Sequence, residues 1–378
     1  MKKWPVVVLG SLASVPATAD VLSNPQIGVV LDAQYEDGGG FSLGHTELNM
    51  SANIDDKFHG ALTTVLESHG DTTELAVEEA FIETLSMPYG SQLRAGRFLS
   101  DFGYMNNQHT HTDSFTDRPG IYKSYLGSHY YDDGIRASIV LPTDLYVRLG
   151  LEALTGSKMS ALENSGEASS VGVYTGTMKI GGDLSASSSW QMGLSYLNNK
   201  NGAVNDFTVD DGSHDHYSGD GHDHSHDHSA SITGEHLYGV DMVWKWAPDG
   251  NYKYQNLTLS AEYMLLDNVI DDKFKHEENA PGQLDGYYLS GVYRFSPNWS
   301  AGLRYGEVET YSAHGHDDHA HFSAEKEKET SVMVAWNASH FGTIRAQYSQ
   351  TKDQENKKDN TFTLQYVMTF GAHGAHAF

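Results

Sequence analysis

The chain has 378 residues, a formal net charge of −26 and no cysteine. The acidic excess argues against a nucleic-acid-binding protein, and the lack of cysteine excludes a disulfide-stabilised fold. After residue 20 no stretch reaches the roughly 18 apolar residues that a helical membrane span requires.

The N-terminus has the pattern of a secretory signal peptide. Lys2 and Lys3 precede a short apolar run from Val6 to Val15, and Ala17 and Ala19 form a small-residue cleavage site. The run is too short to span a membrane. We therefore expect residues 1–19 to be removed and residues 20–378 to be exported.

Segments in which apolar and polar residues alternate recur along the rest of the chain. Such a period of two is typical of strands that have one apolar face. The pattern predicts sixteen strands, an even number, as transmembrane barrels require. Their ranges are 26–35, 41–54, 57–68, 74–86, 91–99, 133–142, 145–155, 171–182, 187–198, 234–247, 254–267, 284–296, 299–311, 328–339, 342–352 and 360–371.

The lengths of the predicted connections support this interpretation. Every second connection is a short turn, and the alternate set contains all the long ones, as in outer-membrane barrels with periplasmic turns and external loops. The long connections are 100–132, 155–170, 199–233, 268–283 and 312–327. The sequence predicts an all-β fold: a porin-like transmembrane antiparallel barrel of about 16 strands without a plug domain.

The long connection at 100–132 occupies the position where porins commonly fold a constriction loop into the channel. It contains His109 and His111, which we consider a candidate relay station for an ion in the channel. The flanking strands 74–86 and 91–99 carry charged residues that we expect on both faces, which favours a subunit interface there. We therefore expect a homotrimer.

Two of the external loops are rich in histidine and acidic residues. Loop 199–233 holds His214, His216, His222, His224, His226 and His228 with Asp215, Asp223 and Asp227, and loop 312–327 holds His314, His316, His319 and His321. Imidazole and carboxylate are ligands for zinc and similar divalent metals. We expect several labile sites of modest affinity, which lose metal as imidazoles protonate below about pH 6.5.

Two other interpretations of these histidines remain open. The loops can be solvated acidic segments in which histidine is incidental, or an acid-sensing gate whose imidazoles become charged near pH 6. No fixed catalytic constellation accompanies the histidines, so we do not expect an enzyme.

The last predicted strand, 360–371, places Phe362, Leu364, Tyr366, Met368 and Phe370 on one face. The chain ends on an aromatic residue, Phe378. This combination is similar to the signal that bacterial outer-membrane barrels present to the barrel assembly machinery. The predicted location is the Gram-negative outer membrane, with lipid and lipopolysaccharide as neighbours.

The segments Glu78–Gly120 and Tyr131–Ala137 resemble a family of zinc-regulated outer-membrane porin or receptor proteins. That family is distantly similar to phosphate-selective porins of the O/P type. The resemblance implies a barrel and a connection with zinc. Some members are labelled TonB-dependent receptors, but here the first predicted strand begins soon after the cleavage site, which leaves no room for a plug.

Together these observations predict a porin for passive uptake of zinc or a similar divalent metal, captured by the external histidine-rich loops. The alternative is a general or anion-type (phosphate-type) diffusion porin whose histidine-rich loops serve adhesion or surface shielding.

Overall fold

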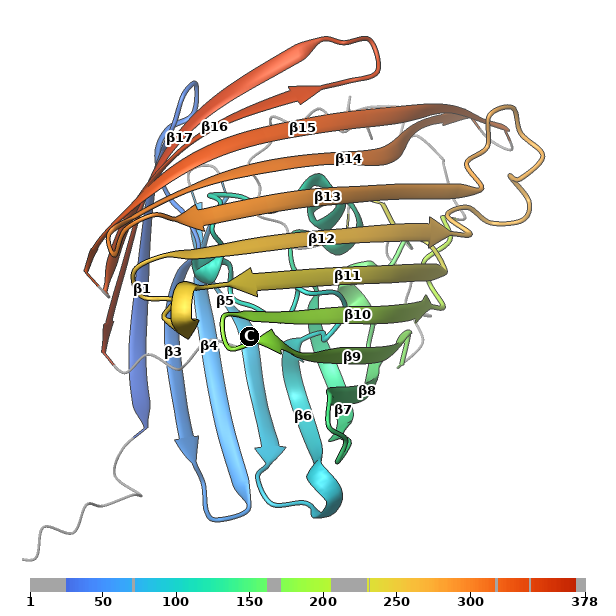
Figure 1. Cartoon of the computed structure of the whole chain (residues 1–378). Coiled ribbons are helices and arrows are strands. Elements are labelled where there is room, and N and C mark those ends of the chain that lie inside the picture. Colours follow the sequence, from blue (N-terminus) through green and yellow to red (C-terminus); the bar gives the residue numbers. More distant parts are fainter. Residues whose placement is uncertain are drawn as a thin grey trace, which may run out of the picture.

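The computed structural model describes residues 25–371 except 70–71, 162–170, 205–229, 231, 317–318 and 340. One antiparallel sheet closes on itself, because the first strand pairs with the last: Gly28 lies opposite Gly371 and Glu36 opposite Thr363. Figure 1 shows the strands following one another around this wall in chain order. No helix among the described residues is long and apolar enough to cross a membrane.

The strands are β1 (Gln26–Glu36), β2 (Gly40–Leu43), β3 (Thr46–Asn53), β4 (Phe58–His69), β5 (Thr72–Thr84), β6 (Ser91–Leu99), β7 (Tyr131–Val140), β8 (Tyr146–Leu154), β9 (Val173–Ser185), β10 (Ser188–Asn199), β11 (His236–Trp246), β12 (Asn256–Asp267), β13 (Gln283–Arg294), β14 (Trp299–His316), β15 (His319–Ser339), β16 (Gly342–Lys352) and β17 (Lys358–Gly371). The helices are α1 (Gly120–Leu126) and the 3-10 turns η1 (Pro88–Gly90), η2 (Thr110–Thr112), η3 (Ser157–Met159) and η4 (Pro248–Gly250).

The barrel has sixteen strands, as predicted, because β2 and β3 are two halves of one strand. Both halves pair with β1, and the register changes by one residue between them: Val30 lies opposite Glu47, whereas Ala33 lies opposite Leu43. A β-bulge around Gly44 and His45 accommodates the extra residue. The sequence pattern predicted this strand at 41–54 but could not show the bulge.

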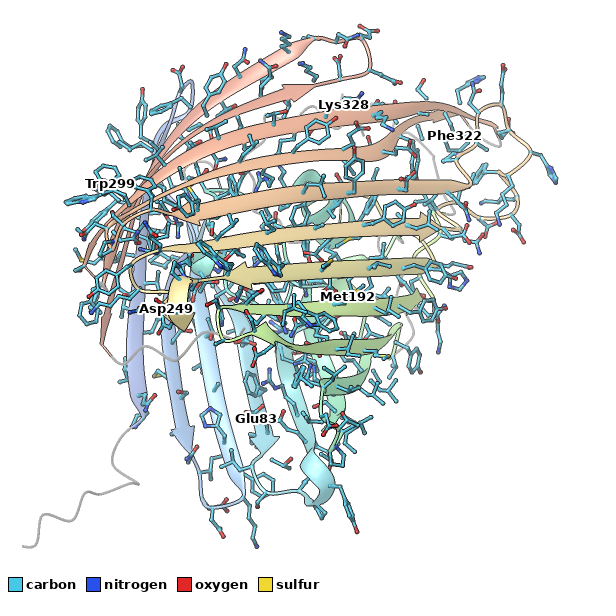
Figure 2. The ribbon with its side chains drawn as sticks, in the orientation of Figure 1. Glu83, Met192, Asp249, Trp299, Phe322 and Lys328 are labelled. Atoms are coloured by element: carbon cyan, nitrogen blue, oxygen red, sulfur yellow. The ribbon has the colours of Figure 1, made fainter. Side chains whose placement is uncertain are left out.

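The outer surface is apolar, as the alternation predicted. Met192 (labelled in Figure 2), Leu194 and Tyr196 are exposed on β10, while Gln191 and Ser195, which alternate with them, are buried on the inner side. The aromatic residues of the last strand, Phe362, Tyr366 and Phe370, are also exposed. Such an outward band, with aromatic residues near its edge, suits a membrane hydrocarbon layer.

The connections are sorted by length, also as predicted. Short turns join β3 to β4, β7 to β8 and β9 to β10, and the long connections lie at the opposite ends of the strands (Figure 1). No separate plug domain occupies the barrel in the part of the chain that the structure describes.

One predicted loop is corrected by the structure. Strand pairing between β14 and β15 continues through most of the range 312–327, up to the pair His316 and His319. These strands therefore form a long hairpin (Figure 1). The strand ladder requires only backbone groups, so loss of the apolar face in this polar segment did not end the strands.

The charged residues from which we predicted a subunit interface lie on β5 and β6. Glu78, Glu79 and Arg94 are largely buried, and Arg94 forms an ion pair with Glu83 across the inner face of the wall. Arg97 is half-exposed on the opposite face and pairs with the exposed Asp133. Charged side chains therefore lie on both faces here, and a subunit interface stays a prediction.

Candidate metal centre in the lumen

The residues first proposed as metal ligands lie mostly outside the described residues. His214, His216, His222, His224, His226 and His228, with Asp215, Asp223 and Asp227, fall in the undescribed range 205–229. In the second stretch, the backbone register pairs His314 with His321 and His316 with His319 at the end of the β14–β15 hairpin. His321 is exposed.

The connection between β6 and β7, residues 100–130, folds into the barrel as expected of a constriction loop. On one side the backbone N–H of Tyr104 and the hydroxyl of Tyr122 donate to Glu262 on β12, at 2.9 and 2.8 Å. On another, the backbone N–H of Thr116 donates to the side-chain oxygen of Gln347 on β16, at 2.9 Å. Bonds to two separate parts of the wall hold the loop inside the barrel.

Inward-facing glycines make room for the apolar residues of this loop. A Cβ atom at Gly239 would lie 2.9 Å from the ring of Phe102, and one at Gly286 would lie 2.5 Å from Ile121 of helix α1. Phe102 and Ile121 are buried in one cluster with other apolar residues of the loop and wall. The loop is therefore packed against the wall as well as hydrogen-bonded to it.

Ion pairs fix both arms of the loop. Arg304 on β14 binds Asp117, and Lys123 lies 3.1 Å from the same carboxylate. Burial alone would raise the pKa of Asp117, but these two cations outweigh burial and hold the pKa below its usual value. Asp101 is bound in the same way by Lys179 and Arg148, which also lower its pKa against the effect of burial.

The two histidines that the sequence singled out in this loop lie at η2. His111 is buried and belongs to the turn, and His109 precedes it. Their rings stack with centroids 5.7 Å apart. Both face the wall formed by β3 and β5: His111 Nδ1 lies 2.8 Å from Glu47 Oε1, and His109 Nδ1 lies 3.2 Å from Glu78 Oε2.

Two β-bulges turn additional ligand residues toward the same point. On β5, Glu79 lies opposite Thr63 and Val77 opposite Thr64, so Glu78 is an extra residue without a ladder partner. In a regular strand one of two successive residues would face lipid, yet Glu78 and Glu79 are both buried. The other bulge, between β2 and β3, places His45 beside them.

These residues form a compact group, which we call the lumen cluster: His45, Glu47, Glu78, Glu79, His109, His111 and His129. His129 comes from the far end of the loop, with Nε2 2.6 Å from Glu78 Oε1. His45 Nε2 lies 3.3 Å from both Glu47 Oε1 and Glu78 Oε1.

The cluster has the geometry of a metal site. His45, Glu78 and His129 each offer one ligand atom within 4.8 Å of the others, and so do Glu47, Glu78 and His109. Zinc bound tetrahedrally at 2.0–2.1 Å separates its ligand atoms by about 3.3 Å. The contacts between donors in the cluster span 2.6–3.5 Å. Three protein ligands leave a fourth position for water or an arriving ligand.

Charge also favours a cation in the cluster. Glu47, Glu78 and Glu79 are buried. Among the described residues, these glutamates form ion pairs with histidines. Burial would lower the pKa of His109, but the carboxylates, Glu47 foremost, outweigh it and raise the pKa well above its usual value. The surroundings therefore strongly stabilise positive charge at this point.

Sequence reasoning found only part of this cluster. The loop position identifies His109 and His111, whereas the sequence analysis does not single out His45 or His129. The adjacent pair Glu78 and Glu79 in a strand was the available signal, because two buried carboxylates in succession require a bulge. It was instead interpreted as a strand with two polar faces.

No family model matches the chain. A relative from Aquifex aeolicus, described as an uncharacterized protein, is 26% identical over 358 residues, which cover 90% of this chain and 70% of the relative.

Three solved structures have a similar fold at low sequence identity. OmpT with loop L8 deleted, an outer membrane protein of Vibrio cholerae, has a TM-score of 0.57 at 11% identity and covers 92% of this chain and 98% of its own; OmpT is also known in a trimer form. The outer membrane channel DcaP of Acinetobacter baumannii has a TM-score of 0.55 at 14% identity, with 92% and 96% coverage. An anion-selective porin from Comamonas acidovorans has a TM-score of 0.53 at 10% identity, with 92% and 99% coverage. The chain thus has the fold of Gram-negative outer-membrane porins. This barrel matches the predicted location in the outer membrane.

Proposed function

We propose that this protein is a diffusion channel for zinc or a similar divalent cation, and that the lumen cluster is the ion-binding station at its constriction. The observation that carries the proposal is the convergence of four histidines and three glutamates between the constriction loop and the wall. Imidazole with carboxylate is a ligand set suited to zinc, and hard cations such as magnesium prefer oxygen alone.

The cluster has a partly exposed edge at two of its histidines. His109 keeps a quarter of its side chain exposed and His45 about an eighth, while the glutamates behind them are almost fully buried. An arriving cation would therefore meet imidazoles first and carboxylates next. Conduction requires binding that is favourable yet reversible, and a site with open coordination positions meets this requirement.

The charges elsewhere in the lumen favour cations over phosphate-like anions. The fold also occurs in an anion-selective porin, so it does not decide selectivity. Here, however, several inward arginines are bound by carboxylates: Arg136 pairs with Glu152, Arg148 with Asp101, and Arg304 with Asp117 and Glu329. Arg345 donates instead to Gln365 and to the backbone oxygen of His111. Arginines that are already paired offer little to an anion.

The external histidines would serve capture. Ten histidines in two stretches lie between residues 214 and 321, and labile sites there would raise the local zinc concentration before the ion enters the pore. We also propose a homotrimer embedded in lipid and lipopolysaccharide after insertion by the barrel assembly machinery. A trimer form of the structurally similar OmpT supports the trimer.

Zinc influx into proteoliposomes tests this function. Vesicles containing the purified protein and a trapped zinc indicator should fill faster with wild type than with Glu78→Gln, which removes a central ligand. Glu83→Gln is the matched control, because Glu83 is an inner-face glutamate bound by Arg94 outside the cluster. Equal zinc influx through all three proteins would favour a general diffusion porin whose histidines have no role in zinc uptake.

A further inference from the structure

We infer that the lumen cluster holds two divalent cations at once, in adjacent positions bridged by the carboxylates of Glu47 and Glu78. This inference rests on the proposed function and specifies how its site works. It assigns a two-ion centre to the constriction, where the proposed function requires only one binding station.

The first position is defined by His45, His129 and one oxygen of Glu78. His45 Nε2 and His129 Nε2 lie 3.3 and 2.6 Å from the same atom, Glu78 Oε1. The two imidazole rings meet edge to face with centroids 5.2 Å apart, so their nitrogens converge on that oxygen from different directions. Three donors with this separation suit one tetrahedral ion, and the Glu47 carboxylate described next can supply its fourth ligand.

The second position uses the other oxygen of the same carboxylate. His109 Nδ1 lies 3.2 Å from Glu78 Oε2 and 3.5 Å from Glu47 Oε2. Glu47 is shared in the same manner, because its Oε1 lies 3.3 Å from His45 Nε2 of the first position. Each of these two carboxylates directs one oxygen to the first position and the other oxygen to the second, which is the arrangement of a bridging ligand. Bridged metal pairs in proteins lie about 3.5–4 Å apart.

The outer contacts orient the ligands of the second position. His109 Nε2, which faces away from Glu78, lies 3.2 Å from Glu79 Oε2. A carboxylate bound to the far nitrogen of a metal-ligating histidine fixes the tautomer and the ring orientation. His111 Nδ1 holds Glu47 Oε1 at 2.8 Å and so orients one bridge. The bulge on β5 supplies both a bridging and an orienting carboxylate from two successive residues.

Charge balance permits two ions. Three buried carboxylates face neutral imidazoles when metal is bound, so one divalent cation would leave the group with a net charge of −1 and two would leave +1. Either occupancy keeps the unpaired buried charge small, and such charge is costly. Repulsion between neighbouring ions also weakens the binding of each ion. An arriving ion can then displace the one already bound, as in multi-site channels.

The experiment counts zinc ions in the cluster without interference from the external histidines. The background protein is the full chain with alanine at His214, His216, His222, His224, His226, His228, His314, His316, His319 and His321. Crystals soaked in zinc and measured across the zinc absorption edge should show two anomalous peaks between β3, β5 and the loop. Equilibrium dialysis of the same protein should give two zinc ions per chain from this centre.

Single substitutions in this background separate the two positions. His45→Ala should remove only the zinc peak of the first position, and His109→Ala only that of the second. Each substitution should reduce the number of bound zinc ions from two to one. Glu78→Gln should weaken both by at least about tenfold, whereas Glu83→Gln should leave both unchanged. Heat-modifiable migration in gels shows that each variant is folded.

The other outcomes are decisive. One zinc peak that persists in both histidine variants would overturn the two-ion inference and leave the proposed function standing. No zinc in the cluster of the folded background protein would overturn both the inference and the lumen station proposed above.

Discussion

At the scale of single residues, the lumen cluster depends on the closed barrel, which brings His45 of the wall and His129 of the loop to the same oxygen of Glu78. His109 and His111 stand out because they are close together in a loop of defined position. His45 and His129 are isolated in sequence, and only the closed barrel brings His45 near the far end of the loop. Their proximity depends on a one-residue bulge, which moves the outward residues from odd positions (Phe41, Leu43) to even ones (Leu48). This change of phase covers too few residues to be recognised in the sequence pattern.

Glu79 gives a prediction about orientation at the residue scale. The Glu79 carboxylate contacts His109 Nε2, the ring nitrogen that faces away from Glu78, and belongs to neither of the two ligand sets. Glu79→Gln should therefore lower zinc affinity at the lumen cluster by about 10–100-fold without removing a ligand. Zinc titration calorimetry in the protein lacking the ten external histidines measures this effect. Unchanged affinity, equal to that of Glu83→Gln, would assign Glu79 a purely structural role.

At the scale of elements, the alternating pattern located every strand of the barrel, because one face of each strand meets lipid. It did not locate the ends of β14 and β15, which continue beyond the apolar zone into the histidine stretch. It also could not show how residues 100–130 fold, because those contacts join the loop to strands distant in sequence. Inward glycines such as Gly239 and Gly286 mark where the loop packs, but nothing in the sequence relates them to Phe102 or Ile121.

The packing of the constriction loop can be tested with a glycine substitution. Gly239→Val places a branched side chain where a Cβ atom already lies 2.9 Å from Phe102. Overpacking of this kind costs about 1–3 kcal/mol, so the loop should shift from the wall and single-channel conductance should rise. Gly176→Val is the control, because its Cβ would make only an ordinary contact, 3.7 Å from Leu151. Identical conductance in both variants would show that the loop does not set the constriction.

The ion pairs of the loop give a prediction for pH. The pKa of Asp117 is below its usual value in the folded protein, so its contribution to docking is complete above the unfolded pKa of about 3.9 and is lost as pH falls below it. Hydrogen exchange of residues 116–126 should thus be slow and, after correction for intrinsic exchange, constant from about pH 5 to 8. Loss of protection near pH 6 to 7 would show that another group controls docking.

At the scale of the whole molecule, we propose that capture and permeation belong to different parts of the chain. The external histidines would gather the ion, and the lumen cluster would pass it through a constriction in which Arg136, Arg148 and Arg304 are paired with carboxylates. The sequence predicted the first part from residue types alone. The second part required the three-dimensional structure, because the cluster draws on the β2–β3 bulge, on β3 and β5, and on both ends of one loop.

Removal of the external histidines tests this division. Alanine at His214, His216, His222, His224, His226 and His228 should leave the barrel folded, because external loops contribute little to the strand ladder. Growth of cells that depend on this protein should decline under zinc chelation and remain normal in replete medium. Equal growth of mutant and wild type under chelation would show that these residues do not serve capture.

The central claim is that the channel conducts zinc-like cations through the lumen cluster. The most direct measurement is the reversal potential of the purified protein in a planar bilayer separating two concentrations of zinc chloride. We predict a potential of the sign that cation permeation produces, reduced in Glu78→Gln and retained in Glu83→Gln. A potential of the sign that chloride permeation produces, unchanged by either substitution, would contradict the account and identify an anion porin.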